Sequence, residues 1–417
     1  MTKTQNNLKL PFILVSSLFF LWGIANNLNG ILIPHLRKAL QLTNMQSTFV
    51  DTAVYFAYFL AAIPAGFILK KFGYKKGIMT GLIVFSLGAF LFVPAANLRD
   101  YNIFLIALFI IGCGLTILET AANPYASKLG DPETATSRLT LAQSFNGLAV
   151  FVAPVIGTIF ILSGQEFSAS ELAAMSETDK ITYLTKEAAS VKLPYISLGI
   201  FLLAIAVLFF VNNFPELKDE ENTDEKGSLA ACIKHKHLLW AVVAQFFYVG
   251  AQVCVTSFFV RMAIAGGGVD EKTAGYYLSI YGILFMVGRF AGSAIMRFIA
   301  PQKLLSLYAV MCILLSIVAI KTDGQYVVLA LGGLGFFMSI MFPTIFALGI
   351  VGLKSNTKPA SSLLVMSIIG GAIFPVIMGN IIDRFGDDIQ IGYIVPMACY
   401  FFVLFFGLKG YKPTAAL

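Results

Sequence analysis

One acidic residue, Glu119, lies inside the apolar segment TILETAANPYASKLG (116–130). A charged side chain at the centre of a bilayer costs at least ~2.5 kcal/mol, so an acid in such a segment normally faces a cavity or a partner and is functional. Asn123 follows four residues later on the same helical face, and Pro124 frees a backbone carbonyl at that level because proline has no N–H group. We therefore predict that Glu119 and Asn123 belong to a polar site inside the protein.

Three other apolar segments each cluster amide or hydroxyl groups, within one turn in the first segment and on one helical face in the other two. They carry Asn26, Asn27 and Asn29, then Gln143 and Asn146, and finally Gln245, Tyr248 and Gln252. Amides and hydroxyls donate and accept hydrogen bonds, and aromatic faces beside them complete a site that suits a neutral polyhydroxyl ligand such as a sugar. A cation would favour several carboxylates, and an anion clustered arginines. Buried amides also join spanning helices for ~0.6 to 2 kcal/mol each, so either role is open to any one of them.

The composition indicates that the chain is an integral membrane protein. Of its 417 residues 58% are hydrophobic and 12% are charged, whereas about 25% are charged in soluble domains. The net charge of +7 comes from basic residues in short connections between apolar runs, a pattern that indicates membrane topology and not nucleic-acid binding. The five cysteines show no disulfide or metal-ligand spacing. We expect no metal, no cofactor and, because no catalytic triad or phosphate loop accompanies the polar faces, no enzymatic activity.

Twelve apolar stretches have the length, about 20 residues, that crosses a ~30 Å hydrocarbon core. They lie near 12–36, 47–69, 77–97, 101–127, 138–163, 194–213, 238–264, 273–298, 303–320, 325–351, 359–382 and 390–408. Lysine and arginine collect on one side of these stretches, which the positive-inside rule assigns to the cytoplasm together with both termini. The first stretch continues for more than twenty residues, so it indicates a spanning helix and not a cleaved signal peptide.

Short repeats divide the chain into two halves. A glycine is followed by a cation and a phenylalanine at three predicted helix ends, which are Gly66/Lys71/Phe72, Gly292/Arg297/Phe298 and Gly379/Arg384/Phe385. NPYASKLG (123–130) also resembles FPTIFALG (342–349). Such nested repeats of three spans are typical of transporters in which two bundles rock around a site at the midplane. We predict six-helix bundles at 1–213 and 238–417, related by a pseudo-twofold axis and joined by a charged linker at 214–237.

Another long connection, at about 165–193, carries two helix-start patterns. SASE (168–171) and SETD (176–179) each place a serine three residues before an acid, as in a capping box. We expect a short helix on the outer surface.

Five segments resemble one family of membrane proteins. They are FFLWGIANNLNGILIPHL (19–36), LETAANPYASKLG (118–130), LAQSFNG (141–147), AQFFYVGAQ (244–252) and FPTIFALGI (342–350). The chain is similar nearly end to end to the fucose and hexose proton-symporter branch of the major facilitator superfamily. This resemblance implies the all-α major facilitator fold with twelve transmembrane helices, a monomer in the bacterial inner (plasma) membrane, and uptake of L-fucose with a proton. It assigns Glu119, Gln143 and Asn146 to the sugar and proton pathway.

Two departures from the family pattern leave the coupling mechanism open. Gly30 stands where the fucose permeases carry an aspartate thought to take the proton, and Lys70 stands where the superfamily usually has an acid. Protonation on Glu119 alone, protonation with the help of Asp51, and an uncoupled facilitator are the three alternatives. Asp51 lies about one turn into the 47–69 span, where the helix dipole also favours an acid without any further role.

Sequence patterns leave the sugar and the class of function partly open as well. Glucose or galactose, which a sister group transports, is the alternative to fucose, because sugar epimers differ only in the direction of one hydroxyl. A sugar sensor could use the same fold, although we would expect it to carry a large soluble domain. In a transporter, burial in a water-poor cavity favours the neutral form of Glu119, which lets this group gain and release a proton.

Overall fold

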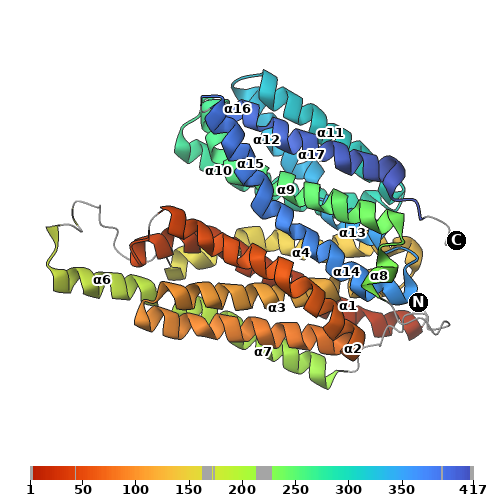
Figure 1. Cartoon of the computed structure of the whole chain (residues 1–417), viewed down its shortest axis with the longest axis horizontal. Helices are drawn as coiled ribbons and strands as arrows, with labels where there is room; N and C mark the ends of the chain where they lie inside the picture. The colour runs from red at the N-terminus through yellow and green to blue at the C-terminus, as the bar shows by residue number, and fades with distance from the viewer. Residues whose placement is uncertain are drawn as a thin grey trace.

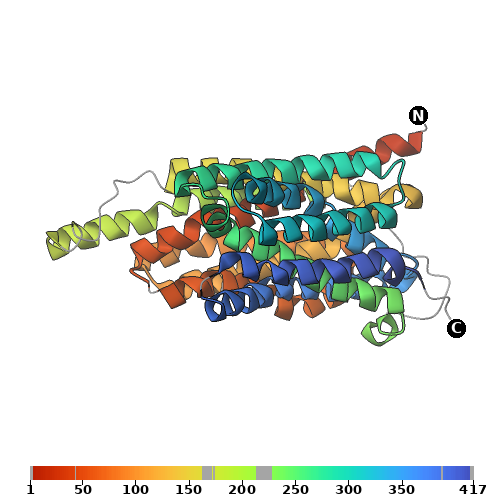
Figure 2. The ribbon, with the colours of Figure 1, turned by 90° about the horizontal axis from the view of Figure 1, so that it is seen from above.

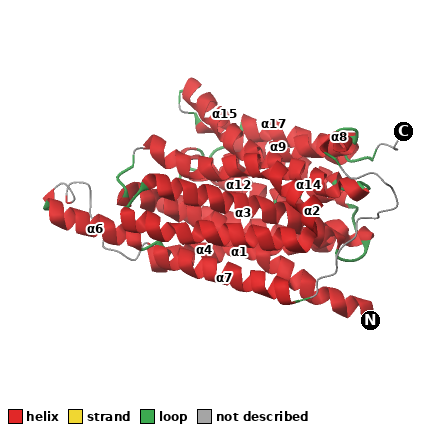
Figure 3. Ribbon diagram, turned by 60° about the horizontal axis from the view of Figure 1, so that its bottom comes forward, coloured by secondary structure: helices red, strands yellow, loops and turns green. Residues whose placement is uncertain are grey.

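The computed structural model describes residues 3–42, 44–161, 171, 174–212, 228–386 and 388–413. The regular elements in this part of the chain are all helical (Figure 3). The first half contains α1 (Lys3–Ala39), α2 (Asn44–Leu98), α3 (Tyr101–Lys128), α4 (Ala135–Ile156), α6 (Glu177–Ala189) and α7 (Lys192–Val211). The second half contains α8 (Leu229–Cys232), α9 (Lys236–Ala265), α10 (Glu271–Ile295), α11 (Pro301–Lys321), α12 (Gln325–Met338), α13 (Met341–Gly349), α14 (Thr357–Met366), α15 (Gly370–Arg384), α16 (Ile389–Gly392) and α17 (Ile394–Phe405).

Twelve membrane crossings fit these helices, as the apolar stretches predict. Ten segments are long and apolar enough to cross a bilayer. One of them, Thr52–Leu98, holds two predicted spans, because Gly73 interrupts α2 with φ 79° and ψ 177°. That left-handed conformation has little steric cost for glycine, which lacks a Cβ atom. The remaining crossing is α4 with the π-helical turn Gly157–Ile161, where a span is predicted at 138–163.

Two crossings of the second half are broken. One consists of α12 and α13, with Ser339 and Ile340 between them, and the other consists of α14 and α15, joined by the 3₁₀ turn Ser367–Ile369. Pro343 lies in the first turn of α13 and cannot donate to the carbonyl of Ser339, four residues earlier. Broken helices in transporters leave backbone groups free for a site, and Ser339 is such a group.

The helices form two groups that follow the two halves of the chain (Figure 1). Helices α1 to α7 pack with one another and helices α9 to α17 do the same, while α4 meets α10 and α2 meets α14 across the boundary. This is the arrangement of two bundles that the internal repeats predict. The domain boundaries at 213 and 238 stay a prediction, because most of the linker, residues 213–227, lies outside the described residues.

The two ends of the molecule differ in their chemistry. The start of α1 and the end of α17 lie at one end, together with α8, and α6 projects from the opposite end (Figures 1 and 2). The first of these, which we call the lysine-rich end, carries Lys70, Lys71 and Lys358, and the Lys358 ammonium lies 5.2 Å from the centre of the Tyr74 ring. Placement of both ends of the chain there agrees with the predicted topology; the side of the membrane stays a prediction.

The outer helix α6 begins where the SETD pattern predicts a start. Its N-cap is Ser176, whose hydroxyl oxygen accepts a hydrogen bond from the backbone N–H of Asp179. Residues 168–170 of the SASE pattern lie outside the described part of the chain.

Close packing of α3 against α2 depends on Gly112. A Cβ atom added at Gly112 would lie 2.6 Å from the Cβ atom of Ala57 and 3.2 Å from the carbonyl oxygen of Val54. Small residues let membrane helices approach in this way. Because Tyr58 follows Ala57, the contact also sets the distance between Tyr58 and α3.

We predict that Gly112→Ala lowers the free energy of unfolding by about 1 to 3 kcal/mol, the usual cost of overpacking a tight contact. The thermal midpoint of the purified protein in detergent measures this effect. Gly275→Ala in α10 is the matched control, because a Cβ atom there meets nothing within 4 Å. Equal midpoints for the two variants would contradict the importance of this helix contact.

Candidate functional site

A cavity of ≈ 260 Å³ lies between the two halves of the chain. Pockets for drug-sized ligands occupy about 300 to 1,000 Å³, so this cavity suits a smaller ligand. The first half contributes Trp22, Asn26, Val54, Tyr55, Tyr58, Glu119, Gln143 and Asn146 to its wall, and the second half contributes Val249, Gln252, Val253, Thr256, Arg289, Phe342 and Ile368. The wall thus combines amides, hydroxyls and aromatic rings with one acid and one base.

Glu119 is almost fully buried, at 6% exposure, and lies at the cavity wall. The hydroxyl of Tyr58 donates a 2.8 Å hydrogen bond to its Oε1 atom. Its Oε2 atom has no hydrogen-bond partner among the described residues. One carboxyl oxygen is therefore held in place, while the other is buried beside the cavity without a donor from the described residues.

Two predicted amides are linked to Glu119 by hydrogen bonds, one directly and one through the other. Asn123 is fully buried and donates from Nδ2 to the backbone oxygen of Glu119 at 3.0 Å. Gln143 lines the cavity and donates from Nε2 to Asn123 Oδ1 at 2.9 Å. Asn123 thus orients Gln143 and does not reach the cavity wall. The sequence placed these residues together correctly, and the structure gives Asn123 an indirect position.

The other predicted residues divide into three groups. Asn26, Asn146 and Gln252 line the cavity. Three others, Asn27, Tyr248 and Gln245, are not among the lining residues. Asn27 donates to the backbone oxygen of Gly23 in its own helix at 2.7 Å, and the Tyr248 hydroxyl donates to that of Met338 at 3.1 Å. Gln245 is completely buried. The side chains of Asn29 and Asp51 lie outside the described residues. A role in sugar or proton binding stays a prediction for each of these residues.

Arg289 is a site residue that the amide stripes do not reveal. Its Nη1 atom donates to the backbone oxygen of Gln143 at 2.6 Å, and its Nε atom donates to that of Ser339 at 3.1 Å. Pro343 explains the second bond, because it leaves the Ser339 carbonyl without a helical donor. The guanidinium carbon also lies 4.6 Å from the centre of the Phe285 ring. Arg289 thus joins the second half of the chain to the backbone of Gln143 in the first half.

Sequence signals exist for Arg289 and Tyr58, which line the cavity but are not among the predicted site residues. Arg289 is a charge inside an apolar stretch, by the same criterion that selects Glu119. Tyr58 follows Asp51 by seven residues and Tyr55 by three, so all three lie near one helical face. Neither pattern specifies the partner, which only the packing of α2 on α3 and of α10 on α4 supplies.

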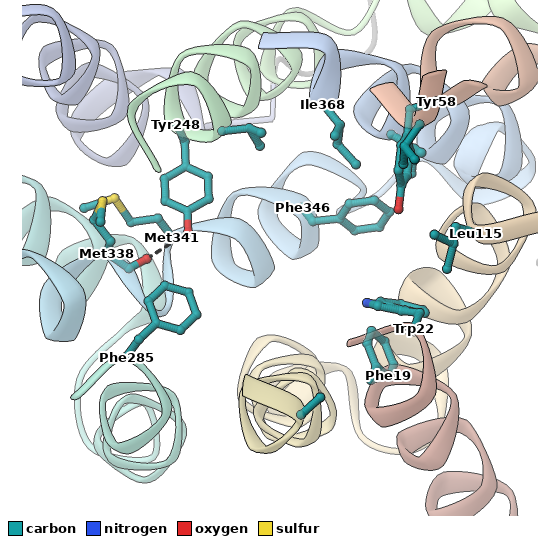
Figure 4. Close-up of a cluster of buried hydrophobic side chains, with 14 of the residues drawn as sticks. Phe19, Trp22, Tyr58, Leu115, Tyr248, Phe285, Met338, Met341, Phe346 and Ile368 are labelled. Carbon is teal, nitrogen blue, oxygen red and sulfur yellow. Dashed lines mark hydrogen bonds between the residues drawn. The ribbon is translucent and has the colours of Figure 1, made fainter. Parts of the chain in front are cut away.

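Aromatic and aliphatic side chains surround the polar groups. Figure 4 shows Trp22 and Tyr58 on the side of the first half, with Phe346 and Ile368 of the second half directed toward Tyr58. In the same view the Tyr248 hydroxyl is directed away from Tyr58, toward Met338. Flat apolar faces next to amides are the combination expected for a sugar site.

Comparisons with known proteins agree with this geometry. The family model described as "Major Facilitator Superfamily" matches residues 14–356. The chain is 39% identical over 413 residues to a "Glucose/galactose transporter" of Brucella abortus, covering 99% of this chain and 96% of the relative. It is 40% identical to an "L-fucose-proton symporter" of Escherichia coli K12, covering 95% of this chain and 92% of the relative.

Solved structures show the same relationship in three dimensions. The structure matches that of a transporter, FucP, described as being in the outward conformation, with a TM-score of 0.90, 39% identity, and coverage of 97% of this chain and 99% of that chain. A proton:xylose symporter, XylE, shares the fold with a TM-score of 0.74 at 13% identity. The chain is therefore a multi-pass membrane protein that belongs to the major facilitator superfamily.

Proposed function

We propose that the protein imports a sugar together with a proton across the bacterial inner membrane, with L-fucose or another 6-deoxyhexose as the first candidate. The observation that carries this proposal is Glu119, an acid with one oxygen that has no partner among the described residues. It lies at a cavity lined mainly by amides, hydroxyls, aromatic rings and aliphatic side chains, with Arg289 as the one base. A neutral sugar needs donors and acceptors without net charge, and a buried carboxyl supplies a protonatable group. We also propose that both termini lie in the cytoplasm, which the lysine-rich end supports, and that the protein acts as a monomer.

Glucose or galactose is the second candidate substrate. The relative from Brucella abortus, named a glucose/galactose transporter, is 39% identical to the chain, nearly the same as the 40% of the fucose-proton symporter. Identity therefore does not separate the two sugars. Gly30 at the position of the family aspartate supports a third candidate, an uncoupled facilitator for the same sugars.

Two small contacts close the lysine-rich end of the cavity. Ser137 of α4 and Ser293 of α10 exchange hydrogen bonds, since each hydroxyl donates to the other residue's backbone oxygen, at 2.7 and 2.8 Å. At the second contact, a Cβ atom on Gly66 of α2 would lie 2.6 Å from Ser362 Oγ of α14. Closure at this end leaves the opposite end as the entrance, in keeping with the outward conformation of the similar FucP structure.

Coupling is supported by a chain of hydrogen bonds that joins the two halves beside the cavity. Tyr58 donates to the Glu119 carboxylate, and Asn123 donates to the backbone oxygen of Glu119. Gln143 donates to Asn123, and Arg289 of the other half donates to the backbone oxygen of Gln143. Loss or gain of a proton at Glu119 changes the charge that Arg289 faces across the cavity. Proton and sugar are coupled when both favour the same conformation. The cavity wall is built from both halves, so a ligand bound there can favour one arrangement of the halves over the other.

Uptake of labelled sugars into proteoliposomes tests the proposed function directly. We expect uptake of at least one member of a panel of L-fucose, D-galactose and D-glucose, with the accumulated amount reduced to equilibration by a protonophore. Uptake that only equilibrates, and is the same with and without the protonophore, would favour the facilitator. Failure of all three sugars to enter would contradict sugar transport.

We predict that Glu119→Gln abolishes the proton flux that follows sugar addition and leaves sugar counterflow in place, because the amide keeps the shape of the acid but carries no exchangeable charge. Glu133→Gln, a change at an exposed acid, is the control and should retain the flux. Asp51→Asn decides between the coupling alternatives: loss of uphill uptake with preserved counterflow assigns the proton to Asp51 as well. Unchanged proton flux in Glu119→Gln would overturn the assignment.

For Arg289→Met we predict at least a tenfold loss of sugar affinity, measured by binding of labelled sugar to the purified protein. The variant removes the guanidinium from the cavity wall and leaves the Ser339 carbonyl without its donor, and an unpartnered buried polar group costs about 1 to 3 kcal/mol. Arg261→Met is the matched control, since Arg261 is exposed on α9 and packs on Phe258. Equal affinities in both variants would show that the bridge from Arg289 is not required for the site.

A further inference from the structure

Gln245 continues the polar stripe of α9 past the end of the cavity. Val249, Gln252 and Thr256 line the cavity, and Gln245 lies four, seven and eleven residues before them, a spacing that places all four on one helical face. Because α9 begins near the lysine-rich end, Gln245 lies one turn beyond the cavity in that direction. It therefore occupies the closed part of the path between the two halves.

The amide of Gln245 is buried without a partner among the described residues. Its exposure is 0%, and neither Oε1 nor Nε2 has a hydrogen bond. A buried amide without a partner is unfavourable relative to one in water. The amide of Gln390, in the same half, has hydrogen-bond partners: its Nε2 donates to the carbonyl oxygens of Ala319 and Thr322 at 2.9 and 2.8 Å.

A structural role alone does not account for Gln245. Glutamines that join spanning helices do so through hydrogen bonds to a neighbour, and Gln245 makes none in this part of the structure. An apolar residue of similar size, such as methionine, would fill the same space without the desolvated amide. The Gln245 amide can form hydrogen bonds only when the lysine-rich end opens and water or a sugar hydroxyl reaches it.

We propose that Gln245 is a positioning residue that sets the balance of the transport cycle. Its buried amide destabilises the conformation that is closed at the lysine-rich end, and the amide becomes solvated in the conformation that is open there. This inference rests on the proposed alternating access, and it concerns the balance between the two conformations and not the identity of the sugar. A residue that raises the free energy of one state shifts the population toward the other. Gln245 thereby keeps the inward-open state accessible.

The test is a distance measurement across the lysine-rich end, made without sugar. Spin labels on Phe72→Cys and Phe298→Cys, at two exposed positions of the two halves, report opening by pulsed electron spin resonance in a Cys113→Ala background. The other native cysteines are buried. Gln245→Met is compared with the labelled parent and with Gln390→Met, and thermal midpoints are recorded for all three.

We expect Gln245→Met to lower the ratio of the long-distance to the short-distance population about tenfold, which corresponds to ~1.4 kcal/mol, and to raise the thermal midpoint. Gln390→Met should lower the midpoint and leave the ratio unchanged. An unchanged ratio in Gln245→Met, or a shift toward the long distance, overturns the proposal. Because no sugar is present, a failure of sugar transport does not affect this outcome.

Discussion

The cost of a carboxyl group inside a bilayer is the constraint on which the rest of the structure depends. Glu119 lies in an apolar helix, where insertion of an unshielded charge would be strongly unfavourable. The structure meets this constraint by a hydrogen bond from Tyr58 and by a cavity between two helical halves. Close packing at Gly112 brings α2 near enough for that bond. The site thus depends on the fold, because a buried carboxyl group is stabilised only at the cavity where the two halves meet.

The two halves share a pattern but contribute different chemistry. Pro124 and Pro343 occupy corresponding positions of the repeat, NPYASKLG and FPTIFALG. The first half adds Glu119 to this frame, and the second half uses the carbonyl freed at Ser339 to hold Arg289. One half therefore supplies the acid and the other the base, and their link through Gln143 spans the boundary that must move during transport. The repeated sequence pattern thus accounts for the two similar bundles, and the residues that differ between the halves, Glu119 and Arg289, are the acid and the base of the site.

How far the sequence predicts this molecule depends on whether a feature is periodic. Apolar length and helical spacing predict the twelve crossings, and they place Gln143, Asn146 and Gln252 correctly on the side of the cavity. The same spacing does not distinguish Gln252 from Tyr248, whose hydroxyl bonds to Met338 instead. Periodicity defines the face of a helix but not its partner or its depth. The bond between Tyr58 and Glu119 joins residues 61 positions apart, and local sequence patterns carry no information about such pairs.

The proposal that Glu119 carries the coupled proton at the sugar cavity is the one on which the others depend. Difference infrared spectroscopy on sugar addition, with Glu119→Gln as the reference, tests it most directly, because a protonated carboxyl has a carbonyl stretch that responds to hydrogen bonding. We expect a carboxyl band that shifts when sugar binds and that is absent from the Glu119→Gln spectrum. A sugar-induced spectrum that is the same in both proteins, although both bind the sugar, would contradict it.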